Sequence, residues 1–474
     1  MVNEASVLVV GGGPAGVTAA VQARHMDAAV TLLEADQVGG TNINRGPAPV
    51  RTMARSARLA RDWTSWSEFG LEGPPPKPNL EAILANSDRV ARHVFEKKHL
   101  ADQLRRHGID LVEHIGPVHF TDPHTLAAGD GRSWRADHIL LAVGGHAGRL
   151  PIPGNELALT YSDIRTLKAL PATVAVVGAA DTGCQIASIL ADLGSNVSLF
   201  EAGPTVVPHA DLSISTELDR AFLRKGIQTY NHTAVTSLRP LGDRIIVEHA
   251  SSAVTAETIV DAVFFAVGWP PNTEQLALDA AGISVERRGI SSDAYLRTEV
   301  DHIFAAGDVN GRSMLVQVAR LEGRIAAQNA LRGPTRQVSY DIVPSASFTD
   351  PEYGGVGLTE TEAAQQHEIV VGLARYDDLL RPVADGHQEG FCKLIADRQQ
   401  KTILGGHVLG EYSAEIIQVI VACMTAGMKI DQVAELPFAF PTFTEGISMA
   451  AQKICSKLGI GDFPPVWSYL GPDE

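Results

Sequence analysis

The chain has 474 residues, which is too long for one ordinary hydrophobic core and predicts two to four domains. Apolar residues make up 45% and charged residues 20%, which is typical of a globular protein and excludes a disordered or fibrous one. Basic residues number 39 against 55 acidic ones, so the net charge of −16 disfavours nonspecific binding to nucleic acid or to an anionic membrane.

The first 270 residues contain an internal repeat. “SVLVVGGGPAG” (6–16) predicts a strand and a glycine turn before the helix “VTAAVQARHM”, and “ATVAVVGAADTG” (172–183) repeats this before “CQIASILADLG”. Glu34 and Glu201 each close the following strand, 18 residues beyond the last glycine of their turn. Each copy later reaches a similar strand and turn, “ILLAVGG” and “VFFAVGW”. The repeat predicts two α/β nucleotide-binding units in tandem.

The first glycine turn has the full GxGxxG pattern between strand and helix. Gly11 permits the tight turn, Gly13 lets the backbone approach a pyrophosphate, and Gly16 lets the helix pack on the strand. The phosphates are expected at the helix N-terminus, with Glu34 on an adenosine ribose.

The second turn reads Gly178-x-Ala180-x-x-Gly183, so one methyl group narrows the approach to the phosphates. Glu201 can accept hydrogen bonds from a ribose 2′-OH and repels a 2′-phosphate. No arginine follows within “AGPTVVP”, so the sequence predicts NADH in preference to NADPH.

Between the two turns, the stretch from Arg45 to about Arg89 predicts a helix, a proline-rich surface loop at Gly73–Asn79 and the start of another helix. From about Tyr340 the sequence predicts an α+β domain with an antiparallel sheet. Its longest apolar stretch, Ala414–Met428, is shorter than the ~20 residues that span a bilayer, so it predicts a packed helix and no membrane partner. The strand beginning at Ser6 leaves no room for a signal peptide, so we expect a cytoplasmic protein.

The cysteines are scattered and form no CxxC pair, which predicts isolated buried thiols without a disulfide framework or a metal site. They are Cys184, Cys392, Cys423 and Cys455. Cys184 directly follows Gly183 and could be a displaced redox cysteine, but a small apolar residue on a helix face is the commoner role.

These turns, “VDHIFAAGDVNG” and the C-terminal motifs “FTDPEYGGVGLTE” and “GFCKLIAD” together resemble the pyridine nucleotide-disulfide oxidoreductases over nearly the whole chain. The resemblance implies FAD on the first unit, the nicotinamide nucleotide on the second and a homodimer made by the C-terminal domain. Asp308 matches the carboxylate that binds the FAD ribitol. The helix from Met314 and Leu315 onward matches the one that points at the flavin.

The implied fold class is α/β, with two Rossmann-like domains and a C-terminal α+β dimerisation domain. Residues 1–150 and 271–339 would form the FAD-binding domain, 151–270 the NAD-binding domain and 340–474 the dimerisation domain. We expect further cofactor contacts from Thr41, Gly116, Gly144 and Gly268. Trp269 and Phe443, like Met314, are expected to pack rather than to act in chemistry.

The segment that carries the family's redox cysteines departs from the pattern. It reads “GGTNINRGPAPVR”, so Asn42 and Pro47 stand where the two cysteines belong. Arg51 replaces the lysine near the flavin, and Gln185 replaces its glutamate partner. The tyrosine that shields the flavin aligns with Asp181. Pro47 suits the first turn of a helix, whereas no thiolate is present to exchange disulfides.

The family's HPTxxE element reads “FPTFTE”, so Phe440 replaces the histidine base while Glu445 stays. Because the cysteines and the base are lost together, we expect Asn42, Asn44, Pro47 and the partner subunit's Phe440 and Glu445 to border an acceptor pocket. The sequence therefore predicts an enzyme that passes electrons from NADH through FAD directly to a non-disulfide small molecule, such as a quinone or dye. The alternatives are a soluble pyridine nucleotide transhydrogenase, a flavin dehydrogenase of a specialised metabolite, and a flavin- or NADH-binding sensor without turnover.

Overall fold

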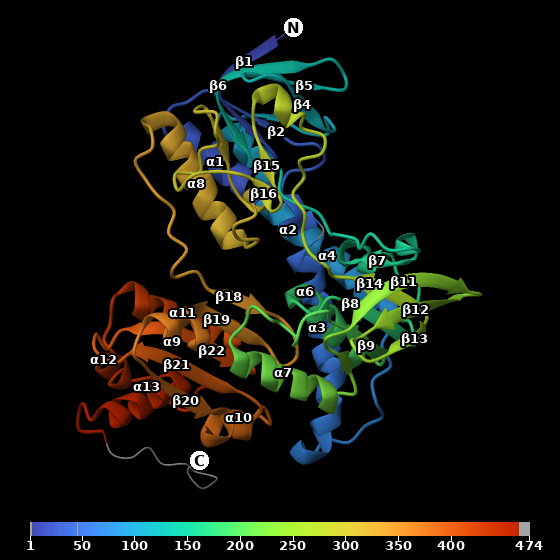
Figure 1. Ribbon diagram of the computed structural model, residues 1–474, viewed down its shortest axis with the longest axis vertical. Coiled ribbons are helices and arrows are strands. Elements are labelled where there is room, and N and C mark those ends of the chain that lie inside the picture. The colour runs from blue at the N-terminus through green and yellow to red at the C-terminus, as the bar shows by residue number, and fades with distance from the viewer. Residues whose placement is uncertain (1, 45, 464–474) are drawn as a thin grey trace. The chain divides into compact units, whose positions relative to one another are not determined.

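The computed structural model describes residues 2–44 and 46–463, so Arg45 lies outside the described residues (Figure 1). The chain forms two compact units, each assembled from separate segments. The first unit comprises Met1–Met53, Glu81–Gly148 and Gly268–Ser339. The second comprises Ala54–Leu80, Arg149–Val267 and Tyr340–Glu474.

The first unit is built on a seven-stranded sheet in which β17 pairs with β6 at the side of the main strand path. In spatial order that path contains β3 (Asp110–Val112), β2 (Val30–Leu33), β1 (Val2–Val10), β6 (Ser133–Leu141), β5 (Thr125–Ala128) and β4 (Val118–Asp122), with β17 at Ile303–Ala305. The strands around β1 are parallel and β4–β6 are antiparallel. All four residues of β2 are buried, as expected for a parallel strand covered on both faces.

The helices of this unit are α1 (Pro14–His25), α2 (Gly40–Asn44), the start of α3 (Pro47–Arg61), α4 (Leu80–Lys98), α5 (Leu100–Arg106) and α8 (Val316–Arg332). A small hairpin, β15 (Val285–Glu286) with β16 (Gly289–Ile290), completes it. Figure 1 shows α1 and α8 side by side. Their backbones nearly touch, because a Cβ added at Gly323 would lie 2.1 Å from the Ala15 carbonyl oxygen.

The second unit contains a five-stranded parallel sheet in the order β10-β9-β8-β14-β7 and a three-stranded antiparallel sheet, β11-β12-β13. The strands are β7 (Leu159–Thr160), β8 (Thr173–Val177), β9 (Asn196–Phe200), β10 (Gln228–Tyr230), β11 (Ala234–Leu241), β12 (Arg244–Ala250), β13 (Thr255–Val260) and β14 (Ala262–Phe265). The helices are α6 (Asp181–Asp192) and α7 (Leu212–Arg224). The parallel sheet, with a helix following β8, repeats the β1-α1-β2 arrangement of the first unit.

The C-terminal part of the second unit confirms the predicted α+β architecture with an antiparallel sheet. Its strands are β18 (Ser345–Ser347), β19 (Tyr353–Gly357), β22 (Ile403–Leu409), β21 (Phe391–Asp397) and β20 (Ile369–Arg375), in spatial order. Its helices are α9 (Glu360–Gln366), α10 (Leu380–Ala384), α11 (Ser413–Thr425), α12 (Ile430–Ala434) and α13 (Glu445–Leu458).

The apolar stretch around residue 420 forms α11, whose Ile416, Ile417 and Ile420 are buried in the core of this domain. The prediction of a packed helix is therefore confirmed. Across residues 2–44 and 46–463, no helix is both long and apolar enough to cross a membrane.

Candidate functional site

The first glycine turn joins β1 to α1, and close packing explains two of its glycines. Gly11 has a positive φ of 104°, and an added Cβ would lie 2.4 Å from the Ala142 carbonyl oxygen. A Cβ on Gly16 would lie 1.8 Å from the Gly11 carbonyl oxygen. Gly13 differs, because its Cβ would meet only the Gly40 Cα, at 3.9 Å. The protein's own packing therefore leaves the approach at Gly13 open, as a pyrophosphate requires.

The α1 helix begins at Pro14, three residues before the start that the sequence suggested, with Gly13 as its N-cap. Pro14 fits there because the first helical N–H has no partner inside the helix. Glu34 follows β2 and accepts hydrogen bonds from the amides of Gly12 (2.6 Å) and Asp36 (2.9 Å). Burial raises the pKa of Glu34, although both amide hydrogen bonds act to lower it.

The second turn, between β8 and α6, repeats the main features of this geometry. Gly178 has a φ of 96°, and a Cβ on Gly183 would lie 1.8 Å from the Gly178 carbonyl oxygen. Glu201 accepts hydrogen bonds from the amides of Ala179 (2.8 Å) and Gly203 (2.7 Å). These donors lie 22 residues before and 2 residues after the carboxylate, as they do around Glu34. The two turns are therefore equivalent nucleotide-binding frameworks.

A third element of the first unit is the loop between β17 and α8, which carries Asp308. Burial raises the pKa of Asp308, and the Trp269 indole opposes this rise. Glu322, fully buried on α8, fixes the loop by accepting hydrogen bonds from the Gly307 amide (2.6 Å) and the Asn310 side chain (2.9 Å). Sequence reasoning missed Glu322, because a single glutamate in a helix gives no sign of a buried partner.

The helix expected from Met314 begins instead at Val316, with Leu315 as an extended N-cap. Met314 is 46% exposed, and its expected packing role stays a prediction. Trp269 is half-buried, and its expected packing role stays a prediction. Phe443 is buried and packs edge-on against Tyr376 and Tyr412, as expected.

The remaining predicted glycine contacts lie in turns of the first unit. Gly116, Gly144 and Gly268 have φ values of 69°, 69° and 125°, and no protein atom lies within 4 Å of a Cβ built on any of them. Their faces are open to a ligand. Open glycines, the half-buried Asp308 and two anion-binding turns fit the dinucleotides that the sequence predicts.

The segment that would carry redox cysteines forms α2 and the start of α3. Thr41 and Asn42 lie half-buried on α2, and α3 begins at Pro47, as expected for a proline at a first helical position. The Pro47 side chain lies outside the described side chains. Arg51 follows on α3 and is half-buried.

The other predicted site residues lie in the second unit. The Gln185 amide donates to the Ser347 hydroxyl at 3.2 Å. Phe440 is 70% exposed, whereas Glu445 is half-buried at the first position of α13, and burial raises its pKa. Asn42 belongs to the first unit, and the grouping of Asn42, Pro47, Phe440 and Glu445 at one site stays a prediction.

The four cysteines are free and buried, which confirms the expected isolated thiols. Cys184 is fully buried on α6 and its thiol donates to the Ala179 carbonyl oxygen at 3.2 Å. Burial raises its pKa well above the usual value, and raises the pKa of Cys392 to about 12 and of Cys455 to about 11. Since the thiolate is the nucleophile, the raised pKa values disfavour reaction of these three thiols.

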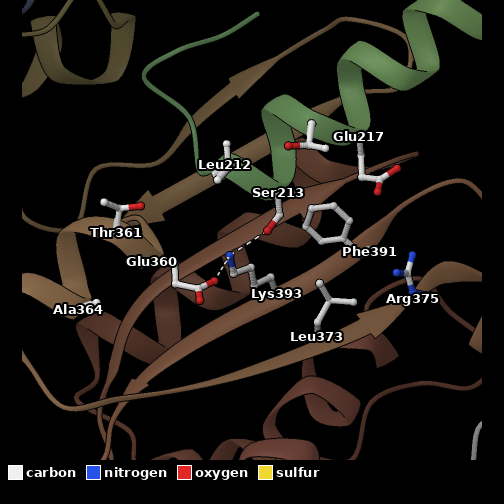
Figure 2. A pocket seen from close by; sticks show the side chains of 11 residues that line it. Leu212, Ser213, Glu217, Glu360, Thr361, Ala364, Leu373, Arg375, Phe391 and Lys393 are labelled. Carbon is white, nitrogen blue, oxygen red and sulfur yellow. Dashed lines mark hydrogen bonds and ion pairs between the residues drawn. The ribbon is translucent and has the colours of Figure 1, made fainter. Parts of the chain in front are cut away.

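A cavity of about 570 Å³ lies between α7 and the C-terminal sheet. No residue of either glycine turn lines it. Figure 2 shows Lys393 beneath this cavity, with its ammonium group between Ser213 and Glu360. Lys393 is 2% exposed and also contacts Asp211 at 2.7 Å. Because the ammonium group already contacts Ser213, Glu360 and Asp211, it forms a structural ion pair rather than a free binding group.

The comparisons with known proteins agree with the two turns and the C-terminal domain. Residues 5–323 match the family model described as pyridine nucleotide-disulphide oxidoreductase, and residues 343–451 match the dimerisation domain of that family. The family binds FAD and NAD(P), and its dimerisation domain supports a homodimer.

Dihydrolipoyl dehydrogenases and a mercuric reductase are similar to this chain over nearly its whole length. A dihydrolipoyl dehydrogenase of Zymomonas mobilis is 29% identical over 456 residues, covering 94% of this chain and 97% of that protein. A dihydrolipoyl dehydrogenase of Chlamydia trachomatis is 30% identical over 451 residues, covering 94% of this chain and 95% of that protein. A mercuric reductase of Staphylococcus aureus is 27% identical over 459 residues, covering 95% of this chain and 83% of that protein.

These relatives contradict the expectation of a non-disulfide, quinone-like acceptor, because their names are those of disulfide reductases. That expectation is wrong. It rested on a few replaced positions, whereas the likeness extends over more than nine-tenths of the chain. The chain belongs to the pyridine nucleotide-disulphide oxidoreductase family and is an FAD-dependent pyridine nucleotide oxidoreductase.

Proposed function

We propose that this chain is an NADH-linked FAD oxidoreductase that acts on a small-molecule substrate without a redox cysteine pair of its own. One observation carries the proposal: all four thiols are buried and free, and none belongs to the segment Gly39–Arg51. FAD, when bound, supplies the electron exchange between the nicotinamide and the second substrate.

In this proposal the residues divide by role. The first turn, Glu34 and Asp308 hold FAD, and the second turn and Glu201 hold NADH. Residues 1–150 and 271–339 form the FAD domain, 151–270 the NAD domain and 340–474 the dimerisation domain. Asn42 and Pro47, together with the partner subunit's Phe440 and Glu445, lie beside the second substrate and orient it.

Thiol titration of the holoenzyme tests the absence of a dithiol step. We expect four titratable thiols per denatured chain both before and after anaerobic reduction by NADH, because no disulfide is available to open. Alkylation of the native, NADH-reduced enzyme should leave the rate of flavin reduction unchanged, and Cys184→Ala should behave like the wild type. New thiols on reduction, or inactivation by alkylation, would contradict the proposal, and lipoamide belongs among the substrates assayed.

The preference for NADH depends on Glu201. We expect Glu201→Gln to weaken NADH binding by roughly 10- to 100-fold, since hydrogen bonds to a charged group contribute about 1.5–3 kcal/mol. The variant should also narrow the difference in kcat/KM between NADH and NADPH. Steady-state kinetics with both nucleotides measure this, and unchanged flavin content shows that the first turn is intact. Equal use of both nucleotides by the wild type would refute the preference.

A further inference from the structure

A charged cluster lies at the start of the helix that follows the second glycine turn. Asp181 is the first residue of α6, directly after the N-cap Ala180. One of its carboxylate oxygens accepts a hydrogen bond from the Tyr353 hydroxyl on β19. The other lies 3.2 Å from Nε2 of His209, in the segment before α7. Asp181 and His209 are each about half exposed, whereas Tyr353 is buried.

The position of Asp181 creates an electrostatic conflict. The N-terminus of α6 attracts an anionic diphosphate through its free amides and helix dipole. A carboxylate in the first turn of the same helix repels that diphosphate. His209 removes the conflict when it is protonated, because the pair then has no net charge.

The local interactions favour the ion pair. Burial acts to raise the pKa of Asp181, but the His209 hydrogen bond and charge, together with the Tyr353 hydroxyl, outweigh burial and lower it. The hydrogen bond with Asp181 raises the pKa of His209.

We propose that the Asp181–His209 pair sets the affinity of the second turn for NADH, tight when His209 is protonated and weaker when it is neutral. The inference rests on the proposed use of NADH. Loss of the His209 proton leaves the Asp181 charge beside the diphosphate, so the dissociation constant rises with pH. By linkage, the dinucleotide takes up a proton when it binds near the pKa of His209.

The other ionisable groups around the pair do not produce the same effect. Burial raises the pKa of Tyr353 and of Cys184 well above their usual values, so both stay neutral at physiological pH. Glu201, at the end of β9, is held by two backbone amides. Asp219 on α7 acts to raise the pKa of the Cys184 thiol and is not among the groups that shift the pKa of Asp181 or His209. Of these groups, the imidazole of His209 is the one that normally changes charge near neutral pH.

ADP-ribose is a suitable probe, because it has the diphosphate and both riboses but cannot reduce flavin. Its dissociation constant for the oxidised holoenzyme can be measured by calorimetry between about pH 5.5 and 8.5, in buffers of different ionisation enthalpy. For the wild type we expect a rise of roughly tenfold across this range, with proton uptake on binding.

Three variants separate charge from structure. His209→Gln should bind weakly at every pH without proton uptake, and Asp181→Asn should bind tightly at every pH. Tyr353→Phe keeps both charged groups and should retain the pH dependence.

His367 makes a matched control, because it pairs with Asp397 at 2.9 Å but lies outside the glycine turn. His367→Gln should therefore follow the wild-type profile. The inference would be wrong if His209→Gln kept the wild-type pH dependence, or if Asp181→Asn bound ADP-ribose no more tightly than the wild type at high pH. Either result would leave the proposed use of NADH intact. Failure of the wild type to bind ADP-ribose at any pH would overturn the proposed use of NADH instead.

Discussion

Replacing Gly183 with alanine is expected to give a flavin-containing protein that NADH no longer reduces efficiently. The added methyl group would lie 1.8 Å from the Gly178 carbonyl oxygen and 2.9 Å from its carbon, so the helix must shift away from the turn. A misplacement of about 1 Å can lower a rate by roughly 100-fold. We expect that loss in kcat/KM for NADH, measured by anaerobic stopped-flow reduction of the flavin.

Gly16→Ala is the matched variant, because its methyl group would lie 1.8 Å from the Gly11 carbonyl oxygen in the equivalent turn. This variant should purify with little or no FAD. Chemical reduction by dithionite should still bleach the Gly183→Ala enzyme, which shows that its flavin is intact. Normal reduction of Gly183→Ala by NADH, or full flavin content in Gly16→Ala, would mean that the turns are assigned to the wrong nucleotides.

Replacing Lys393 with methionine is expected to destabilise the second unit by about 3–5 kcal/mol, the usual cost of leaving a buried charge without its partner. The Asp211 carboxylate, 1% exposed, would lose the ammonium group at 2.7 Å. Urea unfolding of the holoenzyme, followed by circular dichroism, measures the change.

Asp211→Asn in the Lys393→Met background is the control. It removes the uncompensated charge and keeps an oxygen to accept from the Ser213 amide at the start of α7. This double variant should therefore be more stable than Lys393→Met alone. No difference between the two would show that the lost stability comes from packing rather than from charge.

The Asp211–Lys393 pair also makes the free energy of unfolding depend on pH in the acidic range. Burial acts to raise the pKa of Asp211, but the Glu360 amide, His407 and Lys393 together lower it to about 2. A carboxyl with a depressed folded-state pKa contributes stability above its unfolded value of about 3.9, and this contribution is lost as the pH falls toward 2. Lys393→Met should weaken this acid dependence. Unfolding free energies measured between about pH 5 and 2.5 would show it.

The sequence was sufficient to predict the parts of the fold that depend on local spacing. Each glycine turn, the strand before it and the acid after it follow from contacts within about 25 residues. The C-terminal domain was also predictable, because its alternating strands and apolar helix are local patterns. The starts of α1 and α6 were placed three residues late, since a cap residue depends on backbone conformation rather than on hydrophobic spacing.

The long-range polar contacts could not be predicted. Asp181 and Tyr353 are 172 residues apart, and Asp211 and Lys393 are 182 residues apart. Asp181, Asp211 and Lys393 are residue types that are mostly exposed, so only the folded chain reveals their partners. The acceptor was predicted wrongly for a different reason: replaced residues show which chemistry is missing but do not identify the substrate.

The three-segment construction of the first unit sets the order in which the protein can be completed during synthesis. Strand β1 and helix α1 emerge early, but β17, Asp308 and α8 follow the whole of Arg149–Val267. Until α8 emerges, the face of α1 at Ala15 has no neighbour and the Asp308 loop lacks Glu322. A ribosome therefore finishes the intervening segment, which contains the second glycine turn, before the first unit can be completed, and β1 and α1 lack α8 over that interval.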